Sequence, residues 1–332
     1  SNEGAALFSF AVNDNTELDE KITIFAGYIV YNVLKHYIDS QDKLTFKWPN
    51  DIYYENKKIC GILCEKVRDY IIVGIGININ NTDFGMFQEK AISLVEITGK
   101  IHPVQQIIEE VVSNFENQFH SLNKNWENIL QIVNENSYLK DKKILGLASG
   151  GGQQMPIFSA LGANCTVLDY SDKQLEAEKM VAEREKYEIE IVKADMTKKL
   201  PFADNSFDII FHPVSNSYIE KVEPVFKECY RILKKGGILL CGLDIGTNYT
   251  VDEKEEKIIN SLPFNPLVNE EQRKQLEEQD CGIQFSHTIS EQIGGQLKAG
   301  FRLTDIYDDT NGFGRLHELN IASFVATRAI KE

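Results

Sequence analysis

The residues with the clearest chemical potential form a glycine run in the middle of the chain. Residues 144–152 read Ile-Leu-Gly-Leu-Ala-Ser-Gly-Gly-Gly, and a helix-like segment follows them. Asp169 ends a second apolar run, residues 165–169. Glycines let a ligand press against bare backbone, and a carboxylate can accept hydrogen bonds from both hydroxyls of a ribose. The spacing predicts a strand, loop, helix and strand that bind a nucleoside-containing molecule.

A glycine run after a strand can also be only a tight turn, because short glycine motifs match by chance. The following segments favour the binding interpretation. A third strand-like run ends before Asp195 and Met196, a fourth covers residues 209–211, and a fifth covers residues 238–240 after a break at residues 233–237. Strands that alternate with helices predict a parallel sheet covered on both faces.

Two polar residues follow the fourth predicted strand. His212 comes directly after Phe211, and Asn216 lies four residues further on. In open α/β sheets the ligand lies beyond the carboxyl ends of the strands. His212 and Asn216 are therefore the candidate catalytic residues on the substrate side. The alternative for His212 is a loop histidine bonded to backbone. His287, in an insertion after the fifth strand, is a further candidate for reaching the cleft.

The glycine run differs from the dinucleotide pattern G-x-G-x-x-G. The segment from Ala148 to Gly152 instead resembles motif I of class I S-adenosylmethionine-dependent methyltransferases, and the resemblance covers about residues 142–330. The family usually has an acid two residues before its first motif glycine, where this chain has Gly146. The resemblance implies S-adenosyl-L-methionine as the cofactor. It also implies a set of cofactor-binding residues, which are Ser149, Gly150, Gly152, Asp169 at the ribose, Tyr170 beside the adenine, and Asp195 and Met196 at the adenine edge.

A second set of motifs lies in the first third of the chain. Lys47-Trp-Pro-Asn-Asp-Ile52 precedes a hairpin-like stretch, and a strand-like run leads into Gly74-Ile-Gly76-Ile-Asn78. Together these motifs resemble the catalytic domain of biotin–protein ligase. The resemblance implies that Lys47 contacts biotinyl-adenylate, that Ile52 walls the biotin pocket, and that Gly74, Gly76 and Asn78 lie beside the ligand. The alternative is that these residues only preserve a fold.

The ligase resemblance is incomplete. The family's adenylate loop, a Gly-Arg-Gly-Arg-like stretch, is expected just before Ser1, and its small C-terminal barrel is missing because the methyltransferase-like part begins near Lys142. An adenylate without those arginines has few phosphate partners. We therefore expect a truncated ligase-like domain.

Composition narrows the classes of partner. The 332 residues carry 35 Lys and Arg against 50 Asp and Glu, a net charge of −15, which disfavours nucleic acid as a substrate. No apolar run approaches 18 residues and no signal peptide is evident, so no membrane association and a cytoplasmic location are expected. The six cysteines form no CxxC pair and lack a neighbouring His cluster, so no metal site is expected.

These observations predict a two-domain α/β chain. Residues 1–138 are expected to form a truncated α+β biotin–protein ligase-like domain, and residues 139–332 a class I methyltransferase domain with a Rossmann-like, doubly wound sheet. The predicted function is methyl transfer from S-adenosylmethionine to a small molecule that the sequence does not identify. Two alternatives stay open. One is a biotin–protein ligase that lacks its N-terminus, and the other is a non-catalytic S-adenosylmethionine-binding module. A biotin carrier domain is expected as a partner only if the ligase half is functional.

Overall fold

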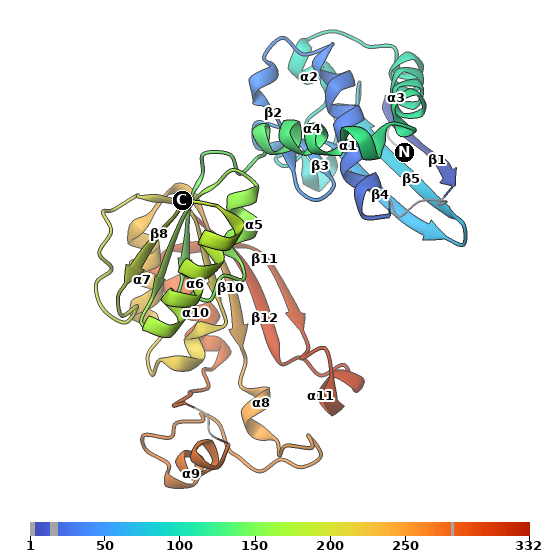
Figure 1. Ribbon diagram of the computed structural model, residues 1–332. Coiled ribbons are helices and arrows are strands. Elements are labelled where there is room, and N and C mark those ends of the chain that lie inside the picture. The colour runs from blue at the N-terminus through green and yellow to red at the C-terminus, as the bar shows by residue number, and fades with distance from the viewer. Residues whose placement is uncertain (1–3, 14–18, 280–281) are drawn as a thin grey trace. The chain divides into compact units, whose positions relative to one another are not determined.

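The chain divides into two compact units in a computed structural model that describes residues 4–13, 19–279 and 282–332. The units cover Ser1–Lys140 and Asp141–Glu332, so the division lies two residues after the boundary predicted from the sequence. Figure 1 shows the elements of both units. None of the described helices is long and apolar enough to cross a membrane.

The first unit is an antiparallel sheet with helices. The strands lie in the order β1-β5-β4-β3-β2 (Figure 1). Their bounds are β1 Ala5–Asn13, β2 Leu44–Lys47, β3 Asp51–Tyr54, β4 Lys57–Val67 and β5 Tyr70–Asn78. The helices are α1 Asp19–Lys35, η1 Gln41–Lys43, η2 Gly85–Phe87, α2 Leu94–Thr98, α3 Val104–Phe119 and α4 Leu122–Glu135.

Side-chain periodicity decides which faces of this unit are buried. Every second residue of β5 from Ile71 to Ile77 is buried, as expected for a strand with one face on a core. Helix α3 buries Ile107, Val111 and Phe115, which recur at the four-residue spacing that lines one face of a helix. The α+β architecture predicted for this part of the chain is confirmed.

The second unit contains a seven-stranded sheet in the order β11-β12-β10-β9-β6-β7-β8. The strands are β6 Lys143–Leu147, β7 Asn164–Asp169, β8 Ile189–Lys193, β9 Phe207–Pro213, β10 Leu233–Asp244, β11 Phe301–Asp309 and β12 Phe324–Lys331. The five central strands from β10 to β8 run parallel, and β12 is antiparallel to both β10 and β11. The doubly wound methyltransferase-type sheet is therefore confirmed, and an antiparallel hairpin of β11 and β12 ends it.

Helices of this unit pack in two pairs. Helix α5 (Met155–Ala160) packs with α6 (Asp172–Glu185) beside β7, whereas α7 (Glu223–Ile232) packs with α10 (Ile289–Ala299) beside β10 and β11 (Figure 1). The remaining helices are η3 Ser215–Tyr218, α8 Thr247–Thr250, α9 Glu270–Glu278 and α11 Gly314–Glu318. Helices α8 and α9 belong to an insertion of residues 245–288 between β10 and α10.

One boundary differs from the sequence-based expectation. Residues 233–237 were expected to separate a helix from the fifth strand, but β10 already begins at Leu233, which pairs with Phe207. The register shifts between Leu233 and Ile238, and Gly236 has a φ of 77°. The break is a bulge inside a longer strand, and glycine accommodates the bulge because it tolerates a positive φ.

The aromatic cluster of the first unit generates a stability prediction. The Phe115 ring is buried, and its centroid lies 4.8 Å from those of Phe10 and Phe25. Replacing a buried phenylalanine with alanine removes apolar burial and leaves a cavity, so Phe115→Ala should lower the free energy of unfolding by about 3–5 kcal/mol. Both tryptophans, Trp48 and Trp126, lie in this unit, so tryptophan fluorescence in urea reports its unfolding selectively.

The matched control is Phe87→Ala. Phe87 is 56% exposed in the same unit, so its loss should change the free energy of unfolding by no more than about 0.5 kcal/mol. Equal effects of the two substitutions would contradict the assignment of Phe115 to the core.

Candidate functional site

The glycine loop lies between β6 and α5, at the carboxyl end of β6. The backbone N–H of Gly150 donates to Asp169 Oδ2 at 3.0 Å, and that of Gly152 donates to Glu178 Oε2 at 2.6 Å. Gly152 has a φ of 73°, and an added Cβ would lie 2.5 Å from Val181 Cγ2. Two carboxylates thus hold the loop by its backbone, and Gly152 has no room for a side chain.

Glu178 was not singled out from the sequence. It lies on α6 with a fully buried side chain, and it also accepts a hydrogen bond from the Tyr187 hydroxyl at 3.0 Å. Burial raises the pKa of Glu178, while the hydrogen bonds from Gly152 and Tyr187 oppose that shift. The available signal was its spacing, because Glu178 lies three residues after Leu175 and four before Ala182 and so shares their face of the helix, where a buried carboxylate needs hydrogen-bond donors.

A cavity of about 720 Å³ opens beside the loop, at the carboxyl ends of β6, β7 and β8. Five residues predicted to bind the cofactor line it, namely Gly150, Asp169, Tyr170, Asp195 and Met196. Ser215, Tyr218, Ile219 and Glu220 line another part of the same cavity. The fold therefore brings most of the predicted cofactor-binding residues together in one space.

Two predicted residues lie off this cavity. Gly152 faces Val181 of α6, as described above. Ser149 is buried, and its hydroxyl has no hydrogen-bond partner among the described residues. That hydroxyl and the Met155 side chain fill the space over Gly146, where a Cβ would clash with both. The position at which the family usually has an acid is thus closed by packing.

The acids of the cavity are held by local hydrogen bonds. Asp169 Oδ1 accepts from the Ser171 N–H at 2.9 Å, in addition to the bond from Gly150 to Oδ2. Asp195 Oδ1 accepts from the backbone N–H of Thr197 at 2.8 Å and from its hydroxyl at 2.7 Å. Burial alone would raise the pKa of Asp195, but the Thr197 donors hold it below its usual value. Asp195 is therefore a carboxylate at neutral pH.

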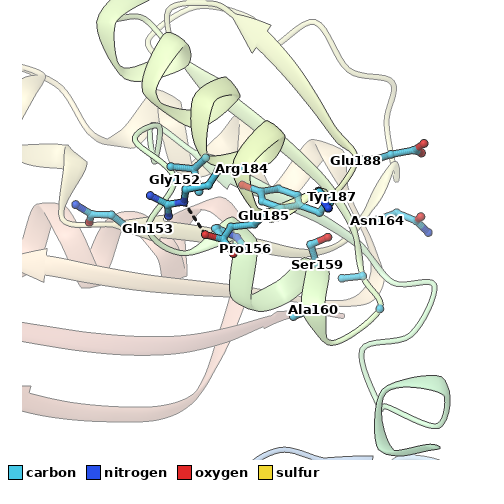
Figure 2. Close-up of a pocket in the computed structure, with 14 residues that line it drawn as sticks. Gly152, Gln153, Pro156, Ser159, Ala160, Asn164, Arg184, Glu185, Tyr187 and Glu188 are labelled. Atoms are coloured by element: carbon cyan, nitrogen blue, oxygen red, sulfur yellow. Dashed lines mark hydrogen bonds and ion pairs between the residues drawn. The ribbon is translucent and has the colours of Figure 1, made fainter. Parts of the chain in front are cut away.

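A second cavity of about 690 Å³ lies between α5 and α6 (Figure 2). Its lining includes Ser159, Asn164 and Tyr187, and two of its four charged residues, Arg184 and Glu185, form an ion pair at 2.6 Å. Neither predicted acid, Asp169 or Asp195, lines it. The first cavity, which combines the predicted acids with bare glycine backbone, is the candidate functional site.

His212 and Asn216 lie together, inside the protein. Their side chains are 0% and 1% exposed, and His212 Nε2 lies 2.7 Å from Asn216 Oδ1. His212 Nδ1 lies 3.0 Å from the Leu147 carbonyl oxygen. Burial lowers the pKa of His212, against the effect of these two contacts. Neither residue presents a free polar group to the cavity, whereas their neighbour Ser215 lines it.

Residues carried over from the ligase resemblance are spread through the first unit. Lys47 Nζ lies 3.0 Å from the Tyr53 hydroxyl and 4.5 Å from the centre of its ring, at the end of β2. Ile52 is fully buried in the core, and the Asn78 side-chain amide donates to the Lys58 and Ile92 carbonyl oxygens. Gly74 and Gly76 occupy alternate positions of β5.

The described parts of the chain contain no group of three or more His, Cys, Asp or Glu side chains that could hold a metal ion. Five cysteines lie in the described parts and are free thiols, and Cys281 falls outside them.

Comparison with known proteins covers both units. Residues 145–241 match a family model described as a methyltransferase domain, and residues 1–80 match the biotin/lipoate A/B protein ligase family. The chain is 41% identical over 201 residues to the uncharacterized methyltransferase YbaJ of Bacillus subtilis, a match that covers 58% of this chain and 78% of that protein.

Two solved structures are similar to parts of the chain. An S-adenosylmethionine-dependent methyltransferase from Mesorhizobium loti aligns with a TM-score of 0.48 and 16% identity, over 62% of this chain and 97% of that chain. A biotin protein ligase mutant from Aquifex aeolicus in complex with biotin aligns with a TM-score of 0.39 and 28% identity, over 42% of this chain and 60% of that chain. From the two family models and the relationship to YbaJ, the chain belongs to the methyltransferases and carries a biotin/lipoate protein ligase-type domain that includes residues 1–80.

Proposed function

We propose that the second unit binds S-adenosylmethionine in the 720 Å³ cavity and transfers its methyl group to a small molecule. The observation that carries this proposal is the meeting of bare backbone at Gly150 with the carboxylates of Asp169 and Asp195 in one cavity. A nucleoside presents ribose hydroxyls and an adenine amino group, all of which donate hydrogen bonds to carboxylates.

The residues present fit this cofactor on steric grounds. A Cβ added at Gly150 would lie 3.1 Å from Asp169 Oδ2 and 2.8 Å from Gln174 Cβ, so a side chain there would crowd the carboxylate. Tyr170 lines the cavity and is 73% exposed, which leaves its ring available to stack on a base. Met196 adds an apolar surface beside Asp195. We therefore assign the nucleoside to this end of the cavity.

A bound S-adenosylmethionine would supply a methyl group on a sulfonium, ready for in-line displacement by an acceptor atom. The protein has to align the acceptor and exclude water. We assign the acceptor side to the wall formed by Ser215, Tyr218 and Glu220, because this wall lines the same cavity as the acids. The buried His212 and Asn216 then support this wall without contacting substrate.

A small acceptor is favoured over nucleic acid because the chain carries a net charge of −15. A non-catalytic S-adenosylmethionine-binding module would bind the cofactor without product formation. Incubating the protein with a metabolite extract and methyl-deuterated S-adenosylmethionine distinguishes the two. Accumulation of S-adenosylhomocysteine together with a labelled methylated product supports transfer, and binding with neither product supports the module.

Cofactor binding generates a direct prediction. Asp169→Ala removes a carboxylate that can accept hydrogen bonds from the ribose, and loss of such charge-assisted bonds costs about 1–3 kcal/mol. The dissociation constant for S-adenosylhomocysteine should therefore rise by roughly 5- to 150-fold. Isothermal titration calorimetry measures this change.

Asp172→Ala is the matched control. Asp172 lies three residues away, is 80% exposed and forms an ion pair with Lys193 at 2.6 Å outside the cavity lining. Its loss should leave S-adenosylhomocysteine affinity within about twofold. No detectable binding by the unmodified protein at millimolar ligand would refute the proposed function.

A second candidate function belongs to the first unit. Residues 1–80 match the biotin/lipoate protein ligase family model, and Lys47 supplies an exposed ammonium at the end of β2. Gly76 of β5 lies opposite Gly61 of β4, and the flexible Lys58 and Leu7 side chains lie over Gly61 and Gly76. We propose that this unit binds a biotinyl-adenylate-like ligand, with Lys47 beside its phosphate.

This second proposal predicts a charge-dependent effect. Lys47→Ala should weaken binding of biotinol-5′-AMP by about fivefold or more, because an ammonium–phosphate contact is lost, and should leave biotin affinity within about twofold. Lys43→Ala, which breaks the exposed Lys43–Glu55 ion pair, serves as the control and should change neither affinity. If Lys47→Ala weakens both ligands equally or neither, Lys47 does not contact the phosphate.

A further inference from the structure

A cluster of buried polar side chains lies behind the η3 wall of the cavity. His287 and Gln292 are 4% and 2% exposed, although neither lines the cavity. His287 directly precedes Thr288, the N-cap of α10, and Gln292 is the fourth residue of that helix. Thr288 and Glu291 form a capping box, whose reciprocal hydrogen bonds satisfy two backbone N–H groups at the helix start. Both polar side chains thus lie beside an ordered helix N-terminus.

His287 holds both ends of η3. Its Nε2 lies 2.9 Å from the Asn216 carbonyl oxygen and 2.9 Å from the Ile219 carbonyl oxygen. Both partners only accept, so Nε2 carries a hydrogen and donates to them. Phe285, two residues before His287, also donates its backbone N–H to the Ser217 carbonyl oxygen at 2.7 Å.

Gln292 holds the side chain of the same turn. Its Oε1 accepts from Asn216 Nδ2 at 2.9 Å, and its Nε2 donates to the Asp244 carbonyl oxygen at 2.6 Å. Asn216 in turn contacts His212, which contacts the Leu147 carbonyl oxygen. A continuous series of contacts therefore runs from the end of β6, through η3, to the end of β10.

The turn that these residues hold is strained. Val214, directly before η3, has a φ of 49°, which is unfavourable for a β-branched residue. Its N–H donates to the Gly242 carbonyl oxygen at 2.8 Å, and its own carbonyl oxygen accepts from the Ser217 hydroxyl at 3.0 Å. Such conformations persist only when surrounding contacts over-determine them, and they gather at functional sites.

We propose that His287 and Gln292 are positioning residues of the methyltransferase site. They hold η3 against the strain at Val214 and so fix the wall that contributes Ser215, Tyr218 and Glu220 to the cavity. This inference rests on the proposed function, because it assigns the purpose of the clamp to the cofactor cavity. It adds to the site two side chains, His287 at the end of the insertion that follows β10 and Gln292 in the first turns of α10.

The experiment compares three variants by calorimetry with S-adenosylhomocysteine and by hydrogen exchange of residues 214–220. His287→Leu removes the donor, and Gln292→Met removes both amide contacts at similar length. Each should weaken binding by about fivefold or more and speed exchange of the turn, since buried acceptors lose their donors. His287→Gln keeps an N–H donor and should stay within about threefold of the unmodified protein.

A double-mutant cycle separates clamping from general stability. Val214→Gly removes the cost of the positive φ, so the effect of His287→Leu on affinity should be smaller in the Val214→Gly background than alone. A merely structural histidine would give the same effect in both backgrounds. His317→Leu, an exposed histidine of the same unit, is the control and should change neither affinity nor exchange.

The outcomes separate the two claims. Measurements are made at a temperature where thermal melts show each variant to be folded. Unchanged affinity and unchanged exchange in both His287→Leu and Gln292→Met would overturn the positioning role. If the unmodified protein binds no S-adenosylhomocysteine, the proposed function fails, while exchange of residues 214–220 still reports whether His287 clamps the turn.

Discussion

The site of the second unit depends on two hydrogen bonds from backbone N–H groups to carboxylates. Gly150 donates to Asp169 and Gly152 donates to Glu178, so one loop is tied to the end of β7 and to the middle of α6. A glycine loop has high conformational entropy when free, and these bonds oppose that freedom. The same Asp169 carboxylate then serves both as an anchor for the loop and as a wall of the cavity.

Buried polar side chains lie near the carboxyl ends of the strands, behind the cavity. The backbone carbonyl oxygens of Leu147 and Asp244 lie at the carboxyl ends of β6 and β10, and each contacts a buried side chain. His212 contacts the first and Gln292 donates to the second, while Asn216 joins these two side chains, and all three residues are buried. A buried polar network favours one arrangement of its elements, because each broken contact leaves a desolvated group. Beside the cavity, hydrogen bonds among His212, Asn216 and Gln292 therefore take the place of apolar packing and hold η3 in position.

The first unit has a different arrangement of sheet and candidate binding residues. Its sheet buries one face against α1 and α3, and its opposite face carries glycines at paired positions of β4 and β5. Lys47 lies at the end of the short strand β2, where Tyr53 and Tyr138 place aromatic rings within 4.5 and 6.0 Å of its ammonium. These cation–π contacts hold the Lys47 ammonium in one position without neutralising its charge.

The sequence by itself determined the central strands of the second unit and the hairpin of the first. Strong apolar runs and their alternation with helices predicted β6 to β10, and the glycine run with Asp169 and Asp195 predicted which side chains meet, because parallel strands bring their carboxyl ends to one edge. The ligase-like hairpin was also predicted, because turn residues between apolar runs specify a hairpin over a short range of sequence.

Only the tertiary structure decided the roles of individual polar residues. His212 and Asn216 lie at the expected edge but turn into the protein, where Asn216 contacts both His212 and Gln292, which lies 76 residues after Asn216. Glu178 anchors the loop because α6, which carries it, packs beside the loop. The Ser149 hydroxyl lies over Gly146, where the absence of a side chain leaves space for it. Such contacts join residues far apart in sequence, and a side chain's direction depends on neighbours that periodicity does not encode.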